Sequence, residues 1–95
     1  MYDVTDLRKN QRKRVLKDGQ LISEGMTSLV NVKIRDLSES GARVETAGII
    51  ELPESFNLLV VSAKAVYPCM ARWRRGNLIG IEFTGPPRPA GLRKF

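Results

Sequence analysis

Histidine is absent from the 95-residue chain, and cysteine occurs only once, at Cys69. A Cys-His or Ser-His catalytic system and a transition-metal site therefore lack the side chains that they need. The ten acidic residues show no paired-carboxylate motif. The composition predicts a protein that is not an enzyme and holds no metal or other cofactor.

Long apolar runs are also missing. No stretch of the sequence approaches the roughly 20 residues that a helix needs to cross a bilayer. Residues 1–6 lack the basic-then-apolar order of a signal peptide. A single cysteine cannot form an internal disulfide, which suits a reducing compartment. These features predict a cytoplasmic protein without membrane insertion.

Positive charge is in surplus, with 16 basic and 10 acidic residues and a formal net charge of +6. The stretch from Arg8 to Lys17 contains basic residues and no acidic one, and a second basic cluster comprises Arg72, Arg74 and Arg75. Such a surplus indicates either a partner that carries phosphate or a solvated basic face that aids solubility. Composition leaves both readings open.

The hydrophobic pattern is that of short strands. Val30, Val32 and Ile34 alternate with polar residues, as expected where one face of a sheet is buried. Gly19 predicts a bulge in the first strand. Turn residues recur every 8–12 positions, which is typical of a small antiparallel barrel or sandwich. The expected strands cover residues 15–22, 29–35, 42–45, 55–61, 65–73 and 78–83.

Both ends of the chain differ from this central part. Residues 1–12 offer little to bury and are expected to form a mobile basic tail. Residues 13–84 form the predicted β domain. Residues 85–95 are proline-rich, so a helix is ruled out until at least Ala90 and little or none is expected after it.

The segment Asp36-x-Ser38-x-x-Gly41 lies between two predicted strands. Aspartate and serine side chains bond local amides, and glycine adopts positive φ, so these residues fit a tight turn. The same residue types are able to hold a ligand. A second element, Arg8-x-x-x-Arg12, is weak evidence alone because ten residues of the chain are arginine.

Together, in this order and strand context, the two elements resemble the PilZ domain family. The similarity extends over about residues 7–84 and includes the closing hairpin around Gly76. The resemblance implies a six-stranded antiparallel β-barrel that binds the bacterial second messenger cyclic di-GMP. The proline-rich C-terminus departs from relatives in which a helix follows the barrel, which puts helix-mediated dimerisation in doubt.

The resemblance also implies a ligand site. The two arginines would grip a phosphate or lie against guanine, with the neighbouring lysine on a phosphate. The aspartate would accept from guanine N–H groups or orient an arginine, the serine would donate, and the glycine would let the backbone come close. The tryptophan is either a wall of the site or a core residue. The predicted site residues are Arg8, Lys9, Arg12, Asp36, Ser38, Gly41 and Trp73. Three further arginines, Arg43, Arg74 and Arg75, are expected to add positive field without touching the ligand.

When the ligand binds, the N-terminal segment would become ordered and form a surface that a downstream protein recognises. The sequence does not identify that protein. Two alternatives remain. A general single-stranded nucleic-acid binder would need stacking aromatics, and the aromatic fraction of 6% weighs against it. A protein-interaction barrel that keeps the motif only as a turn would not need Arg8 and Arg12.

Overall fold

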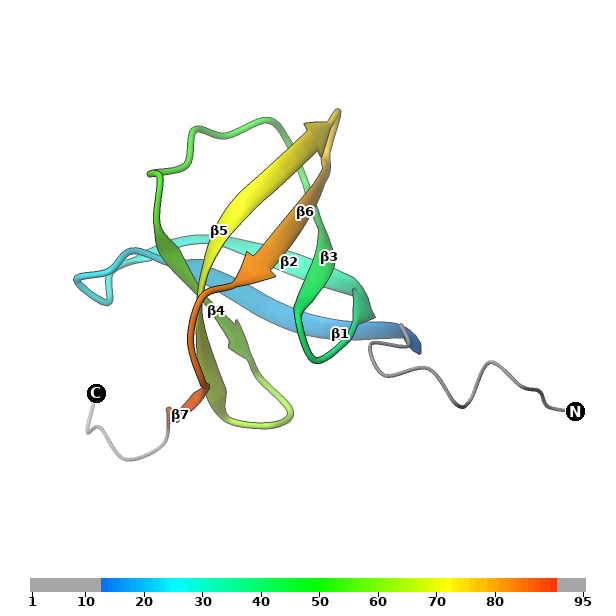
Figure 1. Ribbon diagram of the computed structural model, residues 1–95. Helices are drawn as coiled ribbons and strands as arrows, with labels where there is room; N and C mark the ends of the chain where they lie inside the picture. Colours follow the sequence, from blue (N-terminus) through cyan, green and yellow to red (C-terminus); the bar gives the residue numbers. More distant parts are fainter. Residues whose placement is uncertain (1–12, 91–95) are drawn as a thin grey trace, which may run out of the picture.

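The computed structural model describes residues 13–90, and this part of the chain is all-β, without a helix (Figure 1). All six predicted strands are present, although several are longer than expected, and a short seventh strand follows them. The strands are β1 (Lys13–Ile22), β2 (Ser28–Leu37), β3 (Gly41–Thr46), β4 (Phe56–Val60), β5 (Ala65–Arg75), β6 (Leu78–Phe83) and β7 (Arg88–Pro89).

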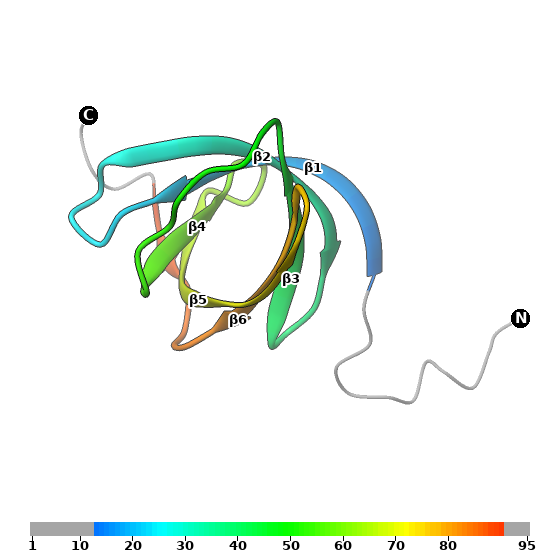
Figure 2. The same cartoon turned by 90° about the horizontal axis from the view of Figure 1, so that it is seen from above.

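The six long strands close into a barrel. Their order in the sheet is β4-β1-β2-β3-β6-β5, and β4 also pairs with β5, which joins the two ends. Each of these pairings is antiparallel. From above, the strands are seen to curve around a common interior (Figure 2). The prediction of a six-stranded antiparallel barrel is therefore confirmed.

The barrel interior is filled by the inward-facing residues of every long strand. The alternation predicted for the second strand is confirmed, because Val32 and Ile34 are buried while Asn31, Lys33 and Arg35 are exposed. Burial of these aliphatic side chains removes apolar surface from water, the main favourable term in folding. The core cluster comprises Leu21, Val32, Ile34, Ala42, Val44, Phe56, Leu58, Val60, Cys69, Ile79 and Ile81.

The bulge predicted at Gly19 is wrong. Gly19 pairs in regular register with Val32 on one side and Val60 on the other. A Cβ at this position would lie 2.9 Å from Leu59 O, so the glycine serves the close approach of two strands. The irregularities of β1 lie instead at its two ends, between residues 14 and 17 and between residues 21 and 22.

Two further bulges matter for the outer face of the barrel. The register of β2 against β3 shifts between Ile34 and Asp36, and that of β5 against β6 shifts between Ala71 and Trp73. In each case one extra residue is inserted in one strand. Because side chains alternate with period two, each insertion moves the residues beyond it to the opposite face.

The chain after β6 returns to the barrel. Arg88 and Pro89 pair with the first two residues of β5, and Ala90 N donates to Lys64 O at 2.8 Å. The predicted hairpin turn between β5 and β6 is confirmed at Gly76, which has a φ of 63°. This hairpin projects at one end of the molecule beside the loop between β3 and β4 (Figure 1).

Candidate functional site

The turn between β2 and β3 is built on Ser38. Its backbone N–H donates to Gly41 O at 2.9 Å. Its hydroxyl donates to the same carbonyl at 3.2 Å and accepts from Ser40 N at 3.3 Å. The serine therefore closes the turn by local hydrogen bonds, as its residue type predicts.

Gly41 begins β3 at a point where two strands approach each other too closely for a side chain. It pairs with Glu82 of β6, and a Cβ added to it would clash with the carbonyl oxygen of Ile81. That oxygen belongs to the backbone of a central strand and cannot move aside. A glycine is thus required at Gly41 by packing, whatever else the position does.

Asp36 and Arg43 form an ion pair on the outer face of the barrel. They are direct partners in the register of β2 and β3, and directly opposed residues point to the same face. Arg43 Nε lies 2.6 Å from Asp36 Oδ2, although its N–H is not aimed well enough at the carboxylate to make a hydrogen bond. Only 8% of the Asp36 side chain is exposed, against 33% for Arg43. Asp36 is thus a nearly buried carboxylate beside a guanidinium.

Trp73 lies on the outer face as well and is 43% exposed. Its direct partner in β6 is Gly80, and a Cβ on Gly80 would clash with the indole at Nε1 and Cε2. The ring therefore packs on bare backbone. Trp73 is therefore a surface residue and not part of the core.

These residues fall in one row across four neighbouring strands. Asp36 of β2 is opposite Arg43 of β3, Arg43 is opposite Gly80 of β6, and Gly80 is opposite Trp73 of β5. Three strand spacings of about 4.8 Å separate the ends of the row by roughly 14 Å along the sheet. The row thus places a carboxylate at one end, an aromatic ring at the other and a guanidinium between them.

A groove of about 270 Å³ runs beside this row. Gly41 and Trp73 both line it, whereas Asp36 and Ser38 do not. Arg72 and Glu82 form an ion pair of 3.2 Å within its lining. The groove is therefore a polar surface with one aromatic side.

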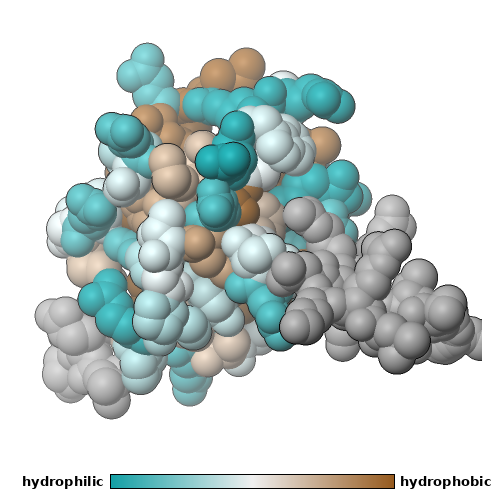
Figure 3. Space-filling model, in the orientation of Figure 1, coloured by the Kyte–Doolittle hydropathy of each residue, from teal (hydrophilic) through white to brown (hydrophobic). Residues whose placement is uncertain are grey.

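The basic cluster of β5 is divided among different contacts. Arg74 Nη2 donates to Ile50 O at 2.6 Å and so holds the loop between β3 and β4 against the hairpin. The Arg75 guanidinium lies 5.8 Å from the centroid of the Trp73 ring, within cation–π range. Hydrophilic side chains cover this hairpin end, with apolar surface of the neighbouring loop beside them (Figure 3).

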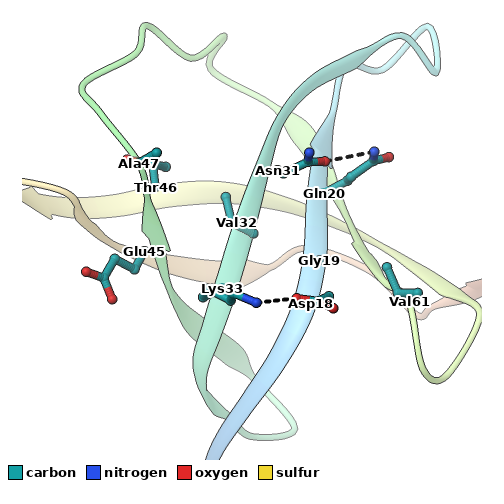
Figure 4. Close-up of a pocket in the computed structure, with 10 residues that line it drawn as sticks. All are labelled: Asp18, Gly19, Gln20, Asn31, Val32, Lys33, Glu45, Thr46, Ala47 and Val61. Carbon is teal, nitrogen blue, oxygen red and sulfur yellow. Dashed lines mark hydrogen bonds and ion pairs between the residues drawn. The ribbon is translucent and has the colours of Figure 1, made fainter.

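A larger hollow of about 690 Å³ lies over β1, β2 and β3. Its polar side chains pair with each other across the strands, as Lys33 Nζ does with Asp18 Oδ1 at 2.6 Å and Gln20 Nε2 with Asn31 Oδ1 at 3.0 Å (Figure 4). None of the four predicted site residues that the structure describes lines it. Its charges and amides satisfy one another, and the predicted site residues Gly41 and Trp73 line the smaller groove instead.

The predicted site residues divide into two groups. Arg8, Lys9 and Arg12 lie outside the described residues. The other four, Asp36, Ser38, Gly41 and Trp73, are found at the β2–β3 turn or in the row that starts beside it.

Sequence reasoning missed two residues that hold this group in place. For Arg43 only a contribution to the positive field was predicted, and its ion pair with Asp36 was not. Gly80 was read as an ordinary strand residue. A glycine inside a strand often marks a close approach, which is the signal that was available for Gly80.

Residues 13–90 contain no group of three or more Cys, Asp or Glu side chains placed to hold a metal ion. Among the same residues no helix is long and apolar enough to span a membrane.

The chain matches a protein-family model. The model of the PilZ domain matches residues 6–94, which is nearly the whole chain and includes both sequence elements and the row. No curated protein matches the chain.

Proposed function

Because the chain belongs to the PilZ domain family, a family of cyclic di-GMP receptors, we propose that it is a non-enzymatic receptor for this messenger. The observation that carries the proposal is the grouping of Asp36, Ser38 and Gly41 at one turn, with Trp73 in the row that starts there. The family match covers the Arg8-x-x-x-Arg12 element as well.

In this proposal the site has two halves. The barrel supplies the carboxylate of Asp36 as an acceptor for guanine N–H groups and the indole of Trp73 as a surface for a base. The N-terminal segment supplies Arg8 and Arg12, whose guanidinium groups pair with phosphate in a bidentate manner or stack on a purine, and Lys9 as a point charge.

Ser38 has a narrower role than the resemblance implies. Its hydroxyl hydrogen points to Gly41 O and its lone pair to Ser40 N. A direct hydrogen bond from Ser38 to the ligand requires that the hydroxyl turn away from Gly41. We therefore assign Ser38 mainly to the shape of the turn that presents its neighbours.

The switch that we propose is attachment of the N-terminal segment to the barrel through the ligand. The surface so formed would be read by a downstream protein. Amide exchange of residues 6–14 should slow when cyclic di-GMP is added, since the ligand would tie these residues to the β2–β3 turn. Unchanged exchange would contradict the switch. The single buried thiol, Cys69, suits action in the reducing cytoplasm.

Isothermal titration calorimetry with cyclic di-GMP tests the proposed function. We expect wild type to bind with a Kd on the order of 0.1–10 µM. Arg12→Ala should weaken binding by about tenfold or more, since a hydrogen bond to a charged group contributes about 1.5–3 kcal/mol. Arg88→Ala removes the same charge from the exposed β7 and should change the Kd by less than about twofold.

Failure of wild type to bind would overturn the proposal. Binding of oligonucleotides of any sequence, with a steep salt dependence, would instead indicate a general nucleic-acid binder. Equal binding by wild type and Arg12→Ala would remove Arg12 from the site while leaving the receptor function in place.

A further inference from the structure

Arg43 has a position that neither the charge pattern nor the motif explains. It is the second residue after Gly41, in a strand whose neighbouring residues Ala42 and Val44 are buried. Its side chain therefore points away from the core, directly opposite Asp36. There its guanidinium reaches the carboxylate through Nε, at 2.6 Å from Oδ2.

The bulge in β2 creates this arrangement. Strict alternation from Val32 and Ile34 would direct Asp36 inward, where a carboxylate would have to lie among aliphatic side chains. The extra residue, Arg35, shifts Asp36 to the outer face and into register with Arg43. Arg35 itself pairs with Glu45 at 2.5 Å, so its guanidinium is engaged away from Asp36.

We infer that Arg43 is a positioning residue for the Asp36 carboxylate and thereby sets which base the site accepts. The inference rests on the proposed function, because it assigns selectivity to the same site. The ion pair is formed through Oδ2, and in this proposal Oδ1 is the oxygen that accepts from the ligand. With its Nε buried and its side chain one-third exposed, Arg43 fixes one edge of the carboxylate without covering the site.

A carboxylate held in this way selects guanine over adenine. An ionised carboxylate only accepts hydrogen bonds. Guanine offers two adjacent donors, N1–H and the N2 amino group, whereas adenine offers an acceptor at N1. A site built to pair with specific donors rejects an analogue that lacks them, provided that its own polar group is held in place. Arg43 supplies that constraint.

The test compares cyclic di-GMP with cyclic di-AMP, which has the same phosphates and ring but different base edges. Arg43→Gln should weaken cyclic di-GMP binding by about tenfold or more and leave any cyclic di-AMP binding unchanged. The Kd ratio, which is the Kd for cyclic di-AMP divided by the Kd for cyclic di-GMP, should therefore fall. Arg43→Lys keeps the charge and should restore part of the ratio. Arg35→Gln, which removes an equal charge from a different ion pair, should leave the ratio within about twofold.

An unchanged Kd ratio in folded Arg43→Gln would overturn the inference, as would equal losses for both ligands. Circular dichroism identifies a variant that fails to fold, and Arg43→Lys then carries the comparison. If wild type binds neither ligand, the proposed function fails, and with it the assignment of selectivity to this site.

A measurement without ligand distinguishes failure of the inference about Arg43 from failure of the proposed receptor function. Urea unfolding of wild type, Asp36→Asn, Arg43→Gln and the double variant gives the coupling between the two side chains. We expect a coupling of about tenfold in the unfolding equilibrium constant, because removal of Arg43 leaves the nearly buried carboxylate of Asp36 unpaired. A coupling below about twofold would show that Arg43 does not hold Asp36, whether or not the protein binds cyclic di-GMP.

Discussion

The indole of Trp73 packs on the backbone of Gly80, its direct partner across the β5–β6 pair. A side chain at Gly80 would occupy the space of the ring at Nε1 and Cε2. The pose of the exposed aromatic residue in the candidate site therefore depends on the absence of a side chain on the neighbouring strand.

Gly80→Ala should displace Trp73 while leaving the barrel intact. The clash is with a side chain that has solvent on its other face, so the cost in stability should be about 1–3 kcal/mol. Trp73 is the sole tryptophan of the chain, so its fluorescence emission reports directly on the displacement. We expect a shift of emission to longer wavelength and a loss of cyclic di-GMP affinity similar to that of Trp73→Ala.

Gly48→Ala is the matched control, because a Cβ at Gly48 meets nothing within 4 Å. It should change neither emission nor affinity. Unaltered emission in Gly80→Ala would show that the ring does not depend on Gly80.

Gly41→Ala should be far more damaging than Gly80→Ala. Both substitutions place a methyl group in occupied space, but at Gly41 the obstacle is the carbonyl oxygen of Ile81, a backbone atom paired within the sheet. Relief requires that β3 and β6 separate, so we expect a loss of about 3 kcal/mol or more in the free energy of unfolding. Urea denaturation measures it.

A Gly41→Ala variant as stable as Gly48→Ala would contradict this account. A severe loss of stability would mean that β3 and β6 have separated. Loss of ligand binding by Gly41→Ala would then reflect disruption of the β3–β6 pairing and would say nothing about contact between Gly41 and the ligand.

Ser38→Ala should weaken the β2–β3 turn. It removes a donor to Gly41 O and an acceptor for Ser40 N, which leaves only the backbone hydrogen bond from Ser38 N. We expect a loss of about 0.5–1.5 kcal/mol in the free energy of unfolding, measured in urea.

Ser40→Ala serves as its control, since the Ser40 hydroxyl has only a long contact of 3.4 Å with Ser38 Oγ. Its stability should stay within about 0.5 kcal/mol of wild type. Equal losses in the two variants would show that the turn does not depend on the Ser38 hydroxyl.

The strands of this barrel could be predicted because local sequence determines them. Alternation through Val30, Val32 and Ile34 specifies a half-buried strand, and Gly76 marks the hairpin. The turn at Ser38 was equally visible, since its chemistry involves residues close in sequence. The positive φ expected of the glycine in this turn was wrong for Gly41, because within residues 13–90 Gly76 is the glycine with a positive φ.

The outer row could not be predicted, because it depends on two bulges. Period two places Asp36 on the same face as Ile34, and Trp73 on the same face as Ala71. Each strand contains one extra residue, Arg35 in β2 and Arg72 in β5. These insertions turn the side chains of Asp36 and Trp73 to the outer face. Bulges are set by pairing between strands, so the local sequence of either segment does not predict them.

Cross-strand partners were hidden for the same reason. That Arg43 meets Asp36, and Gly80 meets Trp73, follows from register across the sheet rather than from spacing in the chain. Residues that act by supporting others are therefore the ones that sequence reasoning missed.

The thiol of Cys69 supplies a prediction for the alkaline range. Its side chain is only 1% exposed, and loss of hydration on burial raises the pKa of the thiol from 9.0 to about 12. Below about pH 9 the thiol is neutral in both the folded and the unfolded chain, so its contribution to stability is complete. Above that pH the unfolded chain loses the proton while the folded barrel keeps it. Stability should therefore fall by about 1.4 kcal/mol per pH unit from this group, until the folded thiol also ionises.

Comparison with Cys69→Ala isolates this effect from the lysines and tyrosines that titrate in the same range. The variant lacks the thiol and pays for a small cavity at every pH, so its free energy of unfolding should lie below that of wild type by a constant amount up to about pH 9. Between about pH 9 and pH 11 the free energy of unfolding of wild type should fall toward that of Cys69→Ala, because ionisation of the thiol stabilises only the unfolded state of wild type. Urea unfolding of both proteins across this range gives the difference directly. A difference that stays constant to about pH 11 would mean that the thiol is not shielded from water in the barrel interior.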